Sequence, residues 1–138
     1  SHILTKGQGY CVQKAVLLVA LARAAHIPAR LRFAEIRIHE TAKSLAEKRG
    51  SNIFPWHGLT DLYINDQWIK ATPTYDVEYC KKAGIAPVEF DGQIDALLPL
   101  STLDGKPNVE YIQDRGFFGD LPLEQIRKAS ASWKYLKQ

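Results

Sequence analysis

A short apolar run constrains the fold of this chain more than any other feature. It extends from Ala15 to Ala22 and is closed by Lys14 and Arg23. Apolar residues recur there at helical spacing, and alanine and leucine favour helix. The pattern begins at Cys11 and ends before Pro28, because proline lacks the backbone donor that a helix interior needs. The run is shorter than the about 18 apolar residues of a membrane span, so the sequence predicts a buried helix that begins at Cys11.

The rest of the chain alternates between strand and helix patterns. The expected elements are a glycine loop, a strand, a helix, a hairpin, a short helix, a long loop, a strand and a last helix. The loop is expected at residues 5–10, the first strand at 30–38, the next helix at 40–49 and the hairpin at 59–71, with its turn at Asn65-Asp66. The short helix follows at 77–82, the long loop at 87–107 and the last strand at 108–112. Asp120 is expected to cap the last helix, which has Leu123, Ile126, Ser130, Trp133 and Leu136 on one face. A helix followed by strands and a last helix indicates an α+β domain.

Length and composition exclude several classes of protein. The 138 residues suit one domain over residues 1–138, and the net charge of +3 comes from scattered basic residues, which argues against a nucleic-acid partner. We expect no membrane association either. Cys11 and Cys80 have no metal-ligand spacing and form no disulfide framework, so we expect no cofactor and a cytoplasmic location. The absence of Met indicates a processed chain or a fragment, and Ser1-His2 is typical of a tag remnant.

Cys11 is the first candidate for chemistry. It follows a Gly-x-Gly loop and opens a helix. The partial positive charge at a helix N-terminus lowers the pKa of a thiol, and the backbone N–H groups there can hold an oxyanion. The alternative is that Cys11 is a small buried apolar residue, as most cysteines without a disulfide are.

His57 is the second candidate. It lies in Pro55-Trp56-His57-Gly58, just before the hairpin, where a histidine near aromatic side chains can act as the base for a thiol. A purely structural role is the alternative. His2, His26 and His39 have no comparable setting.

Three ordered motifs resemble the transglutaminase-like superfamily of cysteine enzymes, including its bacterial members. The first motif consists of Gly9-x-Cys11, Leu18 to Arg23 and Ile27-Pro28-Ala29-Arg30. The second consists of His57 to Tyr63 and Ile64 to Trp68. The third is Thr72-Pro73-Thr74-Tyr75-Asp76. Each motif alone is weak, whereas the three in this order are specific. The resemblance extends from about Gly7 to Arg127.

The resemblance implies a papain-like fold, in which a helix presents the cysteine against an antiparallel sheet. It also implies a Cys-His-Asp triad, with Cys11 as nucleophile and His57 as base, and an acyl-enzyme that water or an amine releases. Relatives usually carry more chain upstream of the catalytic helix, so we expect an N-terminally shortened catalytic core.

The third member of the triad departs from the family pattern. The position at which the family usually has aspartate, four residues after Trp68, is Thr72. A hydroxyl can orient an imidazole but offers no full negative charge. Asp76 reaches His57 only if the chain turns back after Pro73, and we rank it equal to Thr72. Asp61 ranks behind them, because the strand would point it away. Because Thr72 replaces the usual aspartate, a catalytically inactive domain is a further alternative.

Three aromatic or polar residues and two arginines have weaker signals. Trp56 could shield the His57 contact, line a substrate groove or pack in the core. Tyr10 and Gln8 could border the site, although exposed loop positions suit Gln8 better. Arg30 and Arg32 are expected to be charges on a strand face.

Together the residues and the resemblance predict a thiol-dependent hydrolase, a peptidase or amidase with a peptide or amide substrate. Acyl transfer to amines and a binding module of the same fold are the alternatives. Specificity is expected to lie in loops 50–56 and 87–107.

Overall fold

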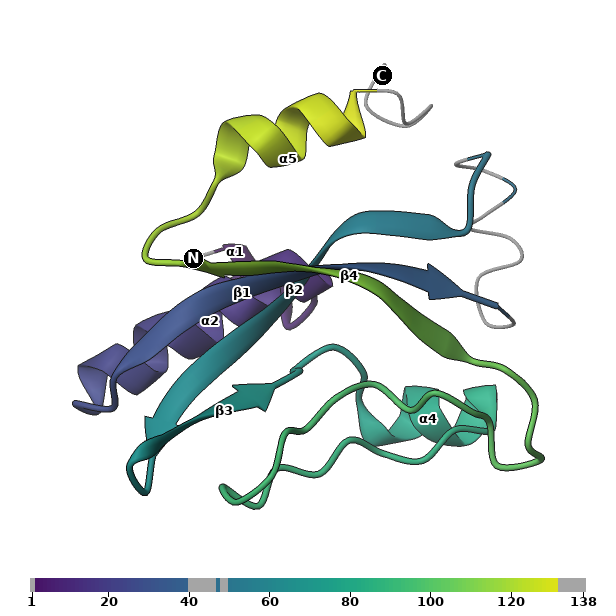
Figure 1. Cartoon of the computed structure of the whole chain (residues 1–138), viewed down its shortest axis with the longest axis horizontal. Helices are drawn as coiled ribbons and strands as arrows, with labels where there is room; N and C mark the ends of the chain where they lie inside the picture. Colours follow the sequence, from purple (N-terminus) through teal and green to yellow (C-terminus); the bar gives the residue numbers. More distant parts are fainter. Residues whose placement is uncertain (1, 40–46, 48–49, 132–138) are drawn as a thin grey trace.

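The computed structural model describes residues 2–39, 47 and 50–131 of the chain (Figure 1). Its elements are α1 (His2–Lys6), α2 (Cys11–Ala24), β1 (Ala29–Ile38), β2 (Ile53–Ile64), β3 (Gln67–Ala71), α4 (Val77–Ala83), β4 (Val109–Phe118) and α5 (Leu123–Ser130). All but Glu47 of the helix expected over residues 40–49 lies outside the described residues, as do Trp133 and Leu136. None of the described helices is both long and apolar enough to cross a membrane.

The four strands form one antiparallel sheet in the order β3-β2-β1-β4. The helix α2 packs on β2 and β1. In Figure 1, α4 and the segment after it lie below the sheet, and α5 lies above it. The fold is therefore α+β with the Cys11 helix against an antiparallel sheet, as predicted.

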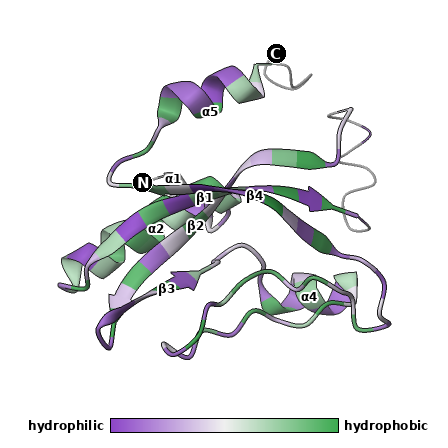
Figure 2. Cartoon of the chain, viewed as in Figure 1, coloured by the Kyte–Doolittle hydropathy of each residue, from purple (hydrophilic) through white to green (hydrophobic). Residues whose placement is uncertain are grey.

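The two faces of the sheet carry separate apolar clusters, because side chains alternate along each strand. Along β1 this alternation is visible as hydrophobic and hydrophilic residues in turn (Figure 2). The side that α2 covers, which we call the helix face, is packed with Ala15, Val19, Ala22, Leu31, Phe33 and Leu62. The opposite side, the loop face, is packed with Ala34, Ile36, Ile38, Leu59, Leu98 and Val109. Small residues on α2 allow the helix to approach the sheet closely.

The hairpin is confirmed, because β2 and β3 pair from Thr60↔Ala71 to Ile64↔Gln67. Asn65 and Asp66 both have positive φ, at 50° and 62°, as a two-residue hairpin turn requires.

One boundary was wrong: β2 begins at Ile53, so His57 lies inside the strand and does not open it. Two residues of β2, Pro55 and Trp56, face the single residue Glu35 of β1 in a bulge. The bulge interrupts the alternation that marks a strand in the sequence, and it tolerates the proline.

Three further differences concern helices and the last strand. The sequence did not predict α1. Asp120 does not cap α5: its carboxylate accepts the N–H of Leu121, and Pro122 holds the N-cap position. The strand β4 continues to Phe118 because pairing with β1 extends it beyond its own local pattern. By contrast α4 matches the predicted short helix and ends at Gly84, whose φ is 65°.

Candidate active site

Cys11 is the first residue of α2, as expected. Tyr10 is the N-cap residue, and its N–H donates to Gln13 Oε1 at 3.0 Å, while its carbonyl accepts the N–H of Lys14 at 2.9 Å. Cys11 is partly exposed and forms no disulfide. The thiol therefore sits at the positive end of a helix dipole, where a thiolate is stabilised.

Gly58 brings the strand of His57 against this helix end. A Cβ at residue 58 would lie 2.8 Å from Val12 Cα and 3.4 Å from the carbonyl carbon of Cys11. Only glycine allows this approach of two backbones. The contact fixes the start of α2 on β2 one residue from His57.

The edge of β2 is not covered by β3 at this point. β3 pairs with β2 only as far as Thr60, and after Ala71 the chain turns away through residues 72–76. Lys14 Nζ donates to the carbonyl of Thr74 at 2.8 Å, which ties this segment to the first turns of α2. The start of α2 and residues 72–75 therefore meet beside the part of β2 that does not pair with β3.

His57 lies on the loop face and is 2% exposed. Its ring meets the Tyr111 ring edge-on, with 6.3 Å between the centroids. Its Nε2 has no hydrogen-bond partner among the described residues. Burial alone lowers the pKa of His57 to about 4, so the imidazole is neutral at pH 7.

Tyr111 packs against the His57 ring, and Tyr75 lies near Cys11. Burial raises the pKa of Tyr75 well above its usual range, and the charges of Tyr79 and Cys11 add to the rise. Tyr111 contributes to the same shift, so Tyr75 lies within electrostatic reach of both Cys11 and Tyr111. Tyr75 also stacks on Tyr79, with ring centroids 4.5 Å apart. No sequence signal predicted a place near the site for either tyrosine, although Tyr75 lies in the third motif and Tyr111 in the strand expected over residues 108–112.

The three candidates for the residue that orients His57 have different surroundings. Thr72 is buried, and its hydroxyl has no partner of good geometry among the described residues. Burial raises the pKa of Tyr111, and the nearby Thr72 hydroxyl offsets part of that rise. Asp76 is exposed and accepts the Tyr79 N–H at 2.7 Å as the N-cap of α4.

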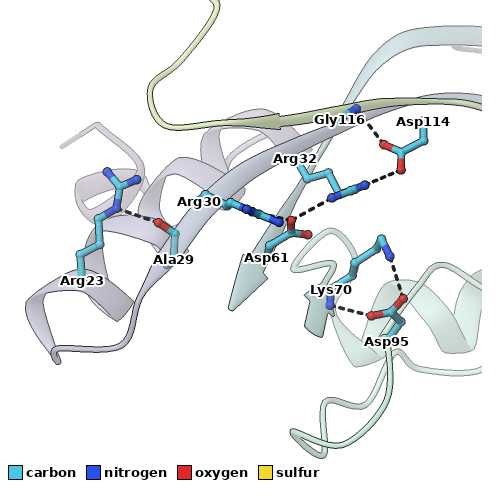
Figure 3. A network of polar contacts seen from close by, with 9 residues as sticks. All are labelled: Arg23, Ala29, Arg30, Arg32, Asp61, Lys70, Asp95, Asp114 and Gly116. Atoms are coloured by element: carbon cyan, nitrogen blue, oxygen red, sulfur yellow. Dashed lines mark hydrogen bonds and ion pairs between the residues drawn. The ribbon is translucent and has the colours of Figure 1, made fainter. Parts of the chain in front are cut away.

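Asp61 is buried and serves another purpose. Its Oδ2 accepts from Arg30 Nε and Arg32 Nη1, both at 2.9 Å (Figure 3). Arg30 and Arg32 are thus strand-face charges, as predicted, held by a buried carboxylate. Asp61 follows His57 on the same face of β2, but its carboxylate is directed to β1.

The remaining candidates lie away from His57 or at the surface. Trp56 is on the helix face, with its ring centroid 5.3 Å from that of Phe33 and 6.0 Å from that of Phe118, so it packs in the core. Tyr10 is 81% exposed and Gln8 is exposed as well. Cys80 is fully buried in α4, and burial raises its thiol pKa, which makes it a poor nucleophile.

The part of the chain that the structure describes holds no cluster of three or more side chains suited to a metal ion. The arrangement therefore offers a thiol at a helix N-terminus, a buried imidazole and two tyrosines for chemistry.

Comparison with known families agrees with the motifs. The family model described as the transglutaminase-like superfamily matches residues 1–73, which include Cys11, His57 and Thr72. That match covers more than half of the 138 residues. No curated protein and no solved structure gives a match.

Proposed function

Because the chain belongs to the transglutaminase-like superfamily of cysteine-dependent hydrolases and acyltransferases, we propose that it is a thiol-dependent peptidase or amidase. Cys11 is the nucleophile and His57 is its base. The contact of Gly58 with the first turn of α2 is the observation that supports the proposal, because it joins the helix turn that begins with Cys11 to the residue that follows His57 in β2.

The reaction follows from these two groups. His57 takes the proton of the Cys11 thiol as the sulfur attacks the carbonyl carbon of an amide. Backbone N–H groups in the first turn of α2 stabilise the oxyanion of the tetrahedral intermediate. The intermediate collapses, the imidazolium gives its proton to the leaving amine, and a thioester remains on Cys11. Water, deprotonated by His57, then releases the acid and the thiol.

Thr72 is our choice for the residue beside His57, because it is buried near Tyr111 while Asp76 caps α4 and Asp61 binds two arginines. A neutral hydroxyl leaves the imidazolium without a negative partner. His57 is therefore expected to be a weaker base than in a triad with an aspartate.

The weak basicity of His57 favours a second candidate, which is a binding module that kept the fold without the activity. An imidazole with a pKa of about 4 accepts a thiol proton at a large cost, since an ordinary thiol has a pKa of about 8.5. Substrate binding that exposes His57 or pairs it with the thiolate would reduce that cost. Transfer to an amine in place of water is a third outcome, because both use the same acyl-enzyme.

Alkylation by iodoacetamide separates the enzyme from the binding module. We expect Cys11 to react at least tenfold faster than Cys80 at pH 6.5. We expect the His57→Gln substitution to slow the alkylation of Cys11 but not that of Cys80. Peptide mapping by mass spectrometry assigns the labels, and urea-unfolded protein gives the intrinsic rate of each thiol. Equal slow labelling of both thiols in the folded protein would contradict the enzyme proposal.

A labelled amine separates hydrolysis from transfer. The protein is incubated with a peptide library and a fluorescent cadaverine derivative, with Cys11→Ala as the control. Hydrolysis predicts peptide products without the label, whereas incorporation of the label that Cys11→Ala abolishes would replace the hydrolase with a transferase.

A further inference from the structure

A cavity of about 200 Å³ lies on the loop face beside His57. Its wall includes Ala34, which is the ladder partner of His57, and Leu59, which is the next residue of β2 on the same face. Tyr111, whose ring contacts the His57 ring, lines it as well. His57 does not line the cavity itself, but three of its neighbours do, so the cavity lies next to the proposed base.

The charged groups around the cavity neutralise one another (Figure 3). Arg32 donates to Asp61 at 2.9 Å and to Asp114 at 2.5 Å, and Lys70 Nζ donates to Asp95 at 2.8 Å. Both cations of the lining thus have carboxylate partners. A charged ligand would have to displace one of these partners or be buried without a counter-ion, and either is costly.

The remaining lining is apolar, and the volume limits what can enter. Leu59 is buried and Tyr111 is half-buried, whereas Leu97 is 37% exposed and Asp114 is exposed too, so these two residues lie at the solvent side of the cavity. A cavity of about 150 Å³ holds one benzene ring, and sites for drug-sized ligands start at about 300 Å³. The space therefore fits a single side chain of leucine or phenylalanine size.

We propose that this cavity binds an uncharged apolar side chain of the acyl donor, next to the amide that Cys11 attacks. This inference rests on the proposed function, and it names the substrate class: peptides or acylated amino acids with an aliphatic or aromatic residue at the acyl position. Leu97, on the loop where specificity is expected, is a specificity-determining residue.

Binding to the Cys11→Ala protein tests the cavity without catalysis. N-acetyl-leucinamide is titrated while NMR follows the signals of Leu59, Leu97 and Tyr111, and N-acetyl-glutamic acid amide and N-acetyl-lysinamide are titrated in parallel. We expect the leucine probe to shift these signals and to bind at least tenfold more tightly than both charged probes. Equal affinity for the charged probes, shifts confined to other residues, or no shift at millimolar probe would overturn the proposal.

Two variants of Leu97 and a matched control locate the binding. Leu97→Trp fills the cavity and is expected to weaken the leucine probe at least tenfold, and Leu97→Ala is expected to shift the preference toward N-acetyl-phenylalaninamide. Leu103→Trp changes a leucine on the same long loop that is 75% exposed and does not line the cavity, and it should leave the affinity unchanged. An unchanged affinity in Leu97→Trp would overturn the proposal.

The proposal and the function fail in different ways. Selective binding of the leucine probe without an acyl-enzyme in the wild type would leave the cavity assignment intact and remove the hydrolase. An acyl-enzyme on Cys11 that forms equally from apolar and charged acyl donors would remove the cavity assignment and leave the hydrolase.

Discussion

At the scale of single residues, the reactivity of this site depends on the surroundings of His57. Its imidazole is buried, neutral at pH 7 and without a partner for Nε2 among the described residues. The candidate that we prefer is the hydroxyl of Thr72, which is also buried and lacks a partner of good geometry among the described residues. Two buried polar groups without partners are costly, and each costs about 1–3 kcal/mol. A substitution at either residue should therefore change both the chemistry and the stability.

Thr72→Asp is expected to raise the pKa of His57. A carboxylate within about 4–6 Å favours the imidazolium and raises such a pKa by about 1–3 units. NMR titration of the His57 ring measures the shift, and alkylation of Cys11 at pH 6.5 should become several-fold faster. Thr72→Asn, which has nearly the same shape without the charge, is the control. A His57 pKa that is equal in the folded aspartate and asparagine variants would show that residue 72 does not act on His57.

His57 also makes stability depend on pH. Its pKa is about 4 in the folded protein and about 6.5 in an unfolded chain, so the unfolded chain binds more protons between these values. The free energy of unfolding therefore falls as the pH is lowered from about 6.5 to 4. Between pH 7 and 4.5 we expect the wild type to lose about 2 kcal/mol more than His57→Gln. Urea unfolding at the two pH values measures this, and identical losses would mean that His57 is not buried in the neutral form.

At the scale of elements, the site depends on how α2 meets β2. The helix places Cys11 at its first residue, and Gly58 lets the strand touch that turn. The Thr60 hydroxyl donates to the carbonyl of Ala15 at 3.3 Å, which adds a second contact one turn further along. A shift of this contact would move the thiol relative to the imidazole while both elements stay intact.

Gly58→Ala is the direct test of this contact. The added Cβ would overlap Val12, so we expect a loss of about 1–3 kcal/mol of unfolding free energy and at least tenfold slower chemistry at Cys11. Gly119→Ala is the matched control, because a Cβ there meets nothing within 4 Å and its φ is not in the left-handed region. Thermal unfolding and Cys11 alkylation are measured on both variants. Equal behaviour of the two would contradict the role of the contact.

The elements also show what the sequence could and could not predict. The helix at Cys11 and the hairpin at Asn65-Asp66 were predictable because helical spacing and turn residues are local signals. The start of β2 was not predictable, because the bulge at Pro55 breaks the alternation of apolar and polar residues. Pairing with β1 decides where this strand begins. The packing of Tyr111 against His57 was not predictable either, since the fold joins segments about 50 residues apart.

At the scale of the whole molecule, the sheet separates a packed helix face from a loop face that carries His57 and the cavity. A buried carboxylate holds the loop face together: Asp61 of β2 binds Arg30 and Arg32 of β1, and Arg32 reaches Asp114 of β4. Arg30 also lies between the rings of Trp68 and Phe117, which are 3.9 Å and 3.6 Å from its guanidinium carbon. This network joins all four strands.

Asp61→Asn should therefore destabilise the whole domain. Removing one partner of a buried ion pair leaves charges without compensation, at a cost of about 3–5 kcal/mol. Glu110→Gln removes the partner of Arg37 between β1 and β4, where both side chains are more exposed, and should cost less than about 1 kcal/mol. Urea unfolding compares the two variants, and a loss of less than about 1 kcal/mol in Asp61→Asn would show that the network does not support the sheet.

The proposed mechanism requires that an acyl group passes through Cys11 with the help of His57. The most direct measurement is mass spectrometry of the intact protein, followed by peptide mapping, after mixing with the p-nitrophenyl ester of N-acetyl-leucine. We predict one acyl group on Cys11 that is released within the time of the experiment, no acyl group at this position in Cys11→Ala, and slower formation and release in His57→Gln. Acyl groups spread over Cys80 and lysines without preference for Cys11, or a Cys11 adduct with the same kinetics in wild type and His57→Gln, would contradict it.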